Sequence, residues 1–212
     1  ILVKNIKYKR HNIMPKEIII NDINTILEDE SIQIVIDAMG GIEPTYSIIK
    51  RFIENGCHLV SANRALLSSK LREIFDHAKQ QKVHLRFEAA IGGGIPLVRA
   101  LRRDLIAAKI KSMWGIVSGS SNYILTQMTK RKCTLKEVLK LPELKEFSEG
   151  HMMLDLEGVD AAQKVALVSA TVFGVEVSDL KIFAEGISNI TPFDIECVER
   201  YGYEFKLLAI AK

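Results

Sequence analysis

The chain has 212 residues, of which 48% are hydrophobic, so it is long enough to bury a core in one large or two small domains. Its net charge is +3, from 29 basic and 26 acidic residues with no long block of one sign, which argues against a nucleic-acid partner. The sequence contains neither a signal-peptide core nor an apolar run long enough to span a membrane. Its three cysteines are widely spaced and form no CxxC pair, which favours reduced thiols and a cytoplasmic location.

Strands and helices alternate in the first part of the chain. The apolar, β-branched run IQIVID (32–37) predicts a parallel strand covered on both faces. Amphipathic helices are predicted at 43–55 and 65–82, and further strands at 58–63 (HLVSAN) and 83–90 (VHLRFEAA). This βαβαβ pattern predicts an α/β fold, a partial Rossmann-like and doubly wound parallel sheet that binds ligands at the carboxyl ends of its strands.

The pattern changes after AIGGGIP (90–96). A helix is predicted at 97–108, followed by a long alternating strand (KIKSMWGIVSG, 109–119) suited to a sheet with one open face. Helices follow at 121–130, 134–141 and 160–173, and another begins at Thr191-Pro192, where threonine is a good N-cap. The final strand lies in YEFKLLAIAK (203–212). We therefore expect two domains, a partial dinucleotide-binding domain at 1–92 and an α+β catalytic and dimerisation domain at 93–212, the latter incomplete at its C-terminal end.

One short stretch, DLEGVDAAQK (155–164), combines three carboxylates with a lysine. Asp160 and Lys164 are four residues apart and share a helix face, while Asp155 and Glu157 are expected just before that helix. These residues could simply cap the helix and form one exposed ion pair. However, the rest of the helix is so apolar that the lysine could instead lie in a cleft, held by carboxylates. A lysine in such a place can transfer a proton, because partial burial lowers a lysine pKa while nearby carboxylates raise it.

Several motifs resemble those of the homoserine dehydrogenase family, in the same order. The stretch DLEGVDAAQK, with Glu149 before it, resembles the family pattern EADPTxDxxGxDAAHK. The segments DAMGGIEP (37–44), LVSANRALL (59–67), FEAAIGGGIPLVRAL (87–101) and GIVSGSSNYILTQM (115–128) resemble further family motifs, as does the chain from FAEGISNITP onward. The resemblance covers nearly the whole chain.

The resemblance implies a reaction and roles for residues. The family interconverts L-homoserine and L-aspartate 4-semialdehyde with NAD or NADP, in the route to threonine, methionine and isoleucine. Lys164 matches its proton-transferring lysine, and Asp160 would orient that ammonium. Glu149 and Asp155 match positions that bind the amino end of the substrate. Glu157 is expected only to stabilise the start of the helix.

The turn AIGGGIP could be a plain domain linker, because three glycines allow a tight backbone turn. In the family, however, this turn holds a monovalent cation, commonly sodium. The matched ligands are the Glu88 carboxylate and the main-chain oxygens of Ile91, Gly93 and Ile95. Hard oxygen ligands suit such an ion, which would fix a hinge.

The cofactor side departs from the family. The GxGxxG turn and the glycine-rich GxGAGxxPT segment are absent, so we expect the chain to start beyond the first and stop before the second. We also expect these residues alone to bind NAD(P) weakly or not at all. The expected cofactor contacts are Gly40, Gly41, Ser61 and Arg64. The family has lysine at the position of Arg64, and arginine cannot give up a proton. Gln163 replaces histidine, and His151-Met152-Met153 replace Asp-Pro-Thr.

Two kinds of protein remain open. The first is a homoserine dehydrogenase seen as an internal fragment of its full chain, with or without a fused aspartate kinase; the second is a divergent, non-catalytic relative that keeps the fold and the dimer interface. A different NAD(P) oxidoreductase with similar substrates is a third, weaker alternative. The resemblance also implies a homodimer formed through the second domain. The strand around Trp114 carries apolar residues on both faces, Met113 among them, although helices covering one side would also explain this pattern.

Overall fold

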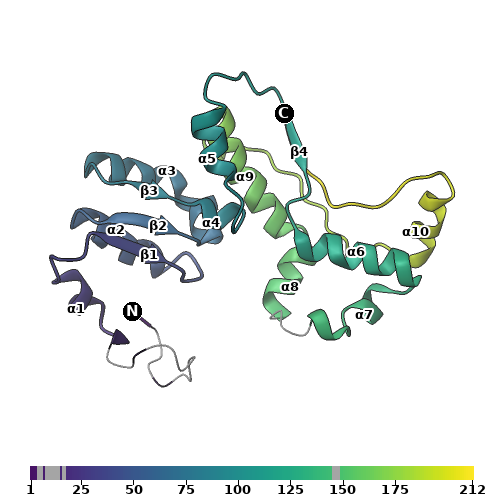
Figure 1. Ribbon diagram of the computed structural model, residues 1–212, viewed down its shortest axis with the longest axis horizontal. Coiled ribbons are helices and arrows are strands. Elements are labelled where there is room, and N and C mark those ends of the chain that lie inside the picture. The colour runs from purple at the N-terminus through teal and green to yellow at the C-terminus, as the bar shows by residue number, and fades with distance from the viewer. Residues whose placement is uncertain (4–6, 8–14, 16–17, 145–148) are drawn as a thin grey trace. The chain divides into compact units, whose positions relative to one another are not determined.

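The structure is a computed structural model that describes residues 1–3, 7, 15, 18–144 and 149–212. The chain divides into two compact units, Ile1–Ala90 and Ile91–Lys212, which are described here one at a time (Figure 1).

The first unit is built around a three-stranded parallel sheet. Its strands are β1 (Ile34–Asp37), β2 (His58–Ser61) and β3 (Leu85–Arg86), in the order β1-β2-β3. Helices α2 (Thr45–Glu54) and α3 (Arg64–Gln80) connect them, and a short helix, α1 (Ile23–Leu27), comes before β1. Leu2 and Ile20 form an isolated parallel bridge. The α/β architecture with a parallel sheet is confirmed.

Local sequence signals explain the helices of this unit. Helix α2 buries Ile49, Phe52 and Ile53, and the chain then turns at Gly56, whose φ of +80° suits a residue without a Cβ. Helix α3 starts at the Asn63 cap, whose side chain accepts a hydrogen bond from the Leu66 N–H. The two helices pack against each other and against the sheet, burying a core of Ile49, Ile53, Leu59, Leu66, Leu67 and Ile74.

Two expectations for this unit were wrong. Strand β1 is not covered on both faces, because Ile34 and Ile36 are 59% and 73% exposed. In the described residues β1 lies at an edge of the sheet, and Val35 and Asp37, which alternate with the two isoleucines, are less exposed. The expected strand 83–90 pairs only at Leu85–Arg86, and Glu88–Ile91 form a short helix, α4. Glutamate and alanine are good helix formers, and they outweigh the apolar run here.

The second unit is mainly helical. It contains α5 (Leu97–Arg99), which continues as a π-helical turn at Ala100–Asp104, then β4 (Met113–Gly115), α6 (Gly119–Arg131) and α7 (Leu135–Val138). After a 3₁₀ turn at Pro142–Leu144 come α8 (Glu149–Leu156), α9 (Val159–Phe173), a 3₁₀ turn at Val177–Asp179, α10 (Pro192–Glu199) and β5 (Ala209–Ala211). The buried face of α6 contributes Ile124, Leu125 and Met128 to a core completed by Val138, Leu144, Met152, Leu156, Ile187 and Ile195.

Helix ends in this unit follow the sequence. Helix α9 ends at Gly174, which has a φ of +67°. Helix α10 begins at the predicted Thr191 cap, which forms a capping box with Asp194, and Pro192 occupies its first turn.

Helix α8 was not predicted. Asp155 was expected outside a helix, but it lies in the last turn of α8. The resembling family pattern has a proline in this stretch, whereas His151-Met152-Met153 contain none, so nothing breaks the helix before Leu156. Glu157 lies in the turn between α8 and α9.

The expected long strands of the second unit are short. Strands β4 and β5 form an antiparallel pair in which Trp114 lies opposite Ile210 and Met113 lies opposite Ala211. Trp114 and Ile210 are 76% and 55% exposed, whereas Met113 is half-buried. The exposed apolar face of this pair, which we call the Trp114 face, consists of Trp114, Ile116, Leu208 and Ile210. Met113 points away from that face.

Candidate functional site

The centre of the candidate site in the second unit is an ion pair on α9. The ammonium of Lys164 lies 2.8 Å from the Asp160 carboxylate, one helical turn away, and the two side chains are only 13% and 11% exposed. The intervening and following residues of α9 are mostly small or apolar, and both charged side chains are largely shielded from solvent. The pair is therefore not an ordinary surface salt bridge.

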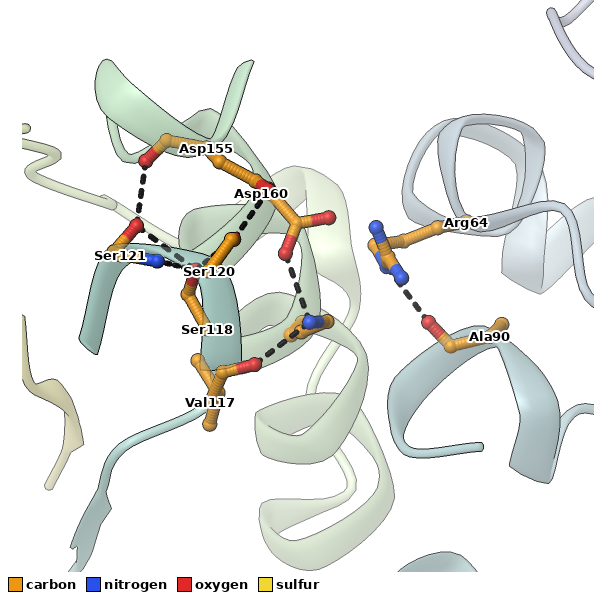
Figure 2. Close-up of polar contacts among 9 residues, drawn as sticks. Arg64, Ala90, Val117, Ser118, Ser120, Ser121, Asp155 and Asp160 are labelled. Atoms are coloured by element: carbon orange, nitrogen blue, oxygen red, sulfur yellow. Dashed lines mark hydrogen bonds and ion pairs between the residues drawn. The ribbon is translucent and has the colours of Figure 1, made fainter. Parts of the chain in front are cut away.

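A second contact holds the same lysine. Lys164 Nζ donates a hydrogen bond of 2.6 Å to the main-chain oxygen of Val117, which lies between β4 and α6 (Figure 2). A carboxylate and a carbonyl together stabilise the charged form of an amine and fix its direction.

The turn after Val117 also holds Asp155. Ser120 Oγ donates a hydrogen bond to the Asp155 carboxylate, and Ser121 Oγ donates to the Asp155 main-chain oxygen at 3.0 Å (Figure 2). Ser118 caps α6 and donates to Ser121 Oγ at 2.9 Å. We call Ser118, Ser120 and Ser121 the serine cluster. Through Val117 and this cluster, the start of α6 contacts both the lysine of α9 and the carboxylate of α8.

Glu149 is the first residue of α8, but its side chain lies outside the described residues. Its predicted role as a substrate ligand therefore stays a prediction. Helix α8 has Asp155 in its last turn, and its contacts with α6 and α9 fix where that carboxylate lies.

In the first unit, polar side chains tie together the carboxyl ends of β1 and β2. Asp37 is 2% exposed and accepts hydrogen bonds from Ser61 Oγ at 2.7 Å and from the Met39 N–H at 2.9 Å. Asn63 Nδ2 donates to the Gly41 oxygen at 2.8 Å. Gly41 has a φ of +77°, and Gly40 has open space where a side chain would be. Parallel sheets bind ligands at this end.

The predicted cofactor residues therefore differ in their surroundings. Gly40 and Gly41 are exposed, whereas Ser61 is fully buried and its hydroxyl is engaged with Asp37. Arg64, in the first turn of α3, donates from Nε to the Ala90 main-chain oxygen at 2.7 Å (Figure 2). This bond holds the guanidinium to the end of α4. Their contact with a cofactor stays a prediction.

The predicted cation ligands lie along the segment from α4 to α5. Glu88 is in the first turn of α4, Ile91 is buried, and Gly93 and Ile95 are exposed. The Gly92 and Ile95 oxygens accept main-chain hydrogen bonds from Ile95 and Leu97, respectively. Where side chains are described, no group of three or more His, Cys, Asp or Glu residues could hold a metal. The cation site at Glu88 and the main-chain oxygens of Ile91, Gly93 and Ile95 therefore stays a prediction.

Some residues around the two sites were not predicted from the sequence. The serine cluster lies within a family-like motif, and serines at the start of a predicted helix are a signal for capping. Asp37 is a polar residue at the end of an apolar strand, which is where a parallel sheet binds its ligands. Val117 carries no such signal, because it acts through its main-chain oxygen.

Comparison with known proteins gives the chain its family. Residues 96–212 match the family model described as homoserine dehydrogenase, and residues 1–88 match the model described as the homoserine dehydrogenase NAD binding domain. Among the described residues, every helix is too short or too polar to cross a membrane.

Curated relatives and solved structures agree with these matches. The homoserine dehydrogenase of Synechocystis is 36% identical over 99% of this chain and 48% of its own length, and that of Bacillus subtilis is 36% identical over 100% and 49%. The crystal structure of a homoserine dehydrogenase from Thiobacillus denitrificans has a TM-score of 0.86 and 37% identity, over 92% of this chain and 45% of that one. The chain spans about half the length of these relatives. It belongs to the homoserine dehydrogenase family.

Proposed function

We propose that the protein, in its full length, is a homoserine dehydrogenase that interconverts L-homoserine and L-aspartate 4-semialdehyde with NAD or NADP, in the biosynthesis of threonine, methionine and isoleucine. The observation that carries this proposal is the ammonium of Lys164, held at 2.8 Å by Asp160 and at 2.6 Å by the Val117 oxygen in a nearly buried position. Family membership supplies the substrate class.

When bound, the nicotinamide would supply or accept a hydride at the terminal carbon of the substrate. The protein's own task is then the proton. During reduction of the aldehyde, negative charge develops on the substrate oxygen, and Lys164 donates a proton to it; during oxidation the neutral amine takes the hydroxyl proton back. Asp160 and Val117 hold the amine in one direction, which supports a role in positioned proton transfer.

Asp155 is proposed to bind the ammonium group of the substrate, for which a carboxylate is the natural partner. Its carboxylate and its main chain are both held by the serine cluster, and this favours a fixed binding position over a mobile surface group. Glu149 is proposed as a second ligand for the same end of the substrate.

The dinucleotide is proposed to bind at the carboxyl ends of β1 and β2, near Gly40, Gly41 and Arg64. Ser61 would contribute indirectly, through its hydrogen bond to Asp37. The open space at Gly40 and the glycine conformation at Gly41 fit close approach of a cofactor to the backbone. Arg64 carries a permanent charge and can bind a phosphate or carboxylate, but it cannot relay a proton. The proton is therefore assigned to Lys164 alone.

A monovalent cation, sodium by preference, is proposed at Glu88 and the main-chain oxygens of Ile91, Gly93 and Ile95. One carboxylate with several carbonyls fits a hard ion of low charge.

We also propose a cytoplasmic homodimer. Three free cysteines favour a reducing compartment, and the Trp114 face offers exposed apolar surface for a two-fold contact.

The proposal is tested with the full-length protein by following oxidation of NADPH or NADH with L-aspartate 4-semialdehyde. Lys164→Ala should lower turnover by roughly 10²–10⁴-fold, the range for loss of a positioned proton donor. The exposed Lys136 on α7 is a matched control, and Lys136→Ala should leave turnover unchanged. An inactive wild-type protein would favour the non-catalytic relative. If Lys164→Ala changes turnover by less than about threefold, the lysine is only a salt-bridge partner.

A further inference from the structure

The turn between α8 and α9 determines how the two halves of the proposed site face each other. Asp155 lies in the last turn of α8, whereas Asp160 and Lys164 lie in the first turns of α9. Only Glu157 and Gly158 separate the two helices. Gly158 is the N-cap of α9 and provides no side-chain cap. The first turn of α9 must therefore be fixed by something other than its own cap.

A distant segment, Glu185 to Ser188, contacts this turn directly. The Ile187 N–H donates a hydrogen bond of 2.7 Å to the Leu156 oxygen, a carbonyl that the end of α8 leaves without a helical partner. Ser188 Oγ donates to the Glu157 carboxylate, also at 2.7 Å. Ile187 itself is 2% exposed, so the segment is anchored in the core.

Two glycines make this contact possible. A Cβ on Gly186 would lie 2.5 Å from Glu157 Cα and 2.7 Å from its carbonyl carbon, and even closer to the Leu156 oxygen. A Cβ on Gly158, whose φ is +76°, would lie 3.1 Å from the Glu185 oxygen. The backbones therefore touch on both sides, and a side chain at Gly186 must push the segment away from the turn.

We propose that the segment Glu185–Ser188 acts as a clasp that sets the position of Asp155 relative to Lys164, with Gly186 and Ser188 as its positioning residues and Glu157 as its anchor. The inference rests on the proposed function. On one side the start of α6 holds the functional groups themselves, through the serine cluster and Val117. On the other side the clasp holds the backbone that connects them. Glu157 thus gains a role that the sequence did not suggest, because its partner lies 31 residues away.

A clasp of this kind predicts a specific kinetic effect. Loosening the turn changes the position of the Asp155 carboxylate relative to the Lys164 ammonium. A displacement of about 1 Å can lower the rate about 10²-fold. The dinucleotide is bound by the first unit and should not be affected. A role in stability alone would lower the melting temperature without changing the kinetics of the folded enzyme.

The experiment uses the full-length enzyme and measures kcat, the KM for L-homoserine and the KM for the dinucleotide. Gly186→Ala should lower kcat/KM for homoserine by roughly 10- to 100-fold and leave the KM for the dinucleotide within about twofold. Ser188→Ala should raise the KM for homoserine about threefold, because loss of the hydrogen bond to Glu157 lets Asp155 shift, and Ser188→Thr should restore it. Ser178→Ala, which removes another exposed serine–carboxylate contact of the second unit, is the control and should match wild type.

If Gly186→Ala fails to fold, the kinetics of Ser188→Ala and Ser188→Thr still test the clasp. Normal homoserine kinetics in Ser188→Ala, or equal effects on both KM values, would overturn the clasp. An inactive wild-type enzyme would instead overturn the proposed function, so the two failures are distinguishable.

Discussion

The ion pair of α9 allows the sharpest prediction, which concerns Asp160→Asn. This substitution keeps the shape of the side chain and removes its charge. At 2.8 Å, and with an effective dielectric constant of about 20, the attraction between the two charges is about 6 kcal/mol. Most of it offsets the cost of removing both ions from water, so the net contribution of the pair is small.

Removing only one partner has a larger effect. Lys164 would remain 13% exposed, with its charge opposed by the Val117 carbonyl but no longer by this carboxylate. Loss of one partner of a buried pair costs about 3–5 kcal/mol, and the residual exposure of this pair favours the lower end. A loss of about 3 kcal/mol corresponds to a fall of roughly 6–12 °C in Tm for a domain of this size.

Thermal or urea unfolding of Asp160→Asn, Lys164→Met and the double variant gives the test. The double variant should recover at least about 1 kcal/mol relative to the sum of the single changes, because no charge is left stranded. Additive single effects, or a loss below about 0.5 kcal/mol for Asp160→Asn, would mean that water screens the pair. Such a result would refute the idea that Asp160 holds the Lys164 ammonium in position, on which the proposed proton transfer depends.

Three further predictions concern other parts of the chain. Trp114→Glu should shift light scattering of the full-length protein from dimer toward monomer, whereas Met113→Glu, on the half-buried side of the strand, should mainly lower stability; a wild-type monomer at micromolar concentration would contradict the dimer. Glu88→Gln should abolish any dependence of activity on sodium or potassium, and retained dependence would remove Glu88 as a cation ligand. The pKa of Asp194 is lowered because it accepts hydrogen bonds from the Thr191 hydroxyl and N–H, so its contribution to stability is present above its ordinary value of 3.8 and is lost as the pH falls through the lowered one. Asp194→Asn should remove this part of the acid dependence of unfolding, and an unchanged pH profile would show that the capping box contributes nothing there.

Much of the fold could be predicted because periodicity and caps are local signals. The alternation of β1, α2, β2 and α3 and the start of α10 at Thr191 follow from residues close together in the sequence. Strand length was overestimated, since β4 and β5 pair only where both backbones meet, and an apolar alternating sequence continues beyond that contact. Exposure of Ile36 was also unpredictable, because it depends on what covers the sheet.

In the candidate site, too, local contacts could be predicted and long-range contacts could not. The pairing of Asp160 with Lys164 could be predicted from their spacing of one helical turn. The hydrogen bond from Lys164 to Val117 and that from Ser120 to Asp155 join residues 47 and 35 positions apart. No local pattern records such contacts, and one of them involves a main-chain oxygen that every residue possesses.

The residues between Asp155 and Asp160 therefore matter for the geometry of the proposed site as much as the two carboxylates do. From Asp155 to Asp160 the chain ends one helix, passes through a left-handed glycine and starts another helix. Because a helix advances about 100° per residue, one residue added to α9 between Asp160 and Lys164 would turn the lysine away from Asp160. One residue added within the turn would instead leave α9 intact and move it against Asp155, while breaking the contact with Gly186. On the proposed function, the first change would remove proton transfer, and the second would weaken substrate binding as well. The spacing within this motif is thus fixed by backbone geometry on both sides of the turn, and not only by Asp155, Asp160 and Lys164, the side chains proposed to carry the chemistry.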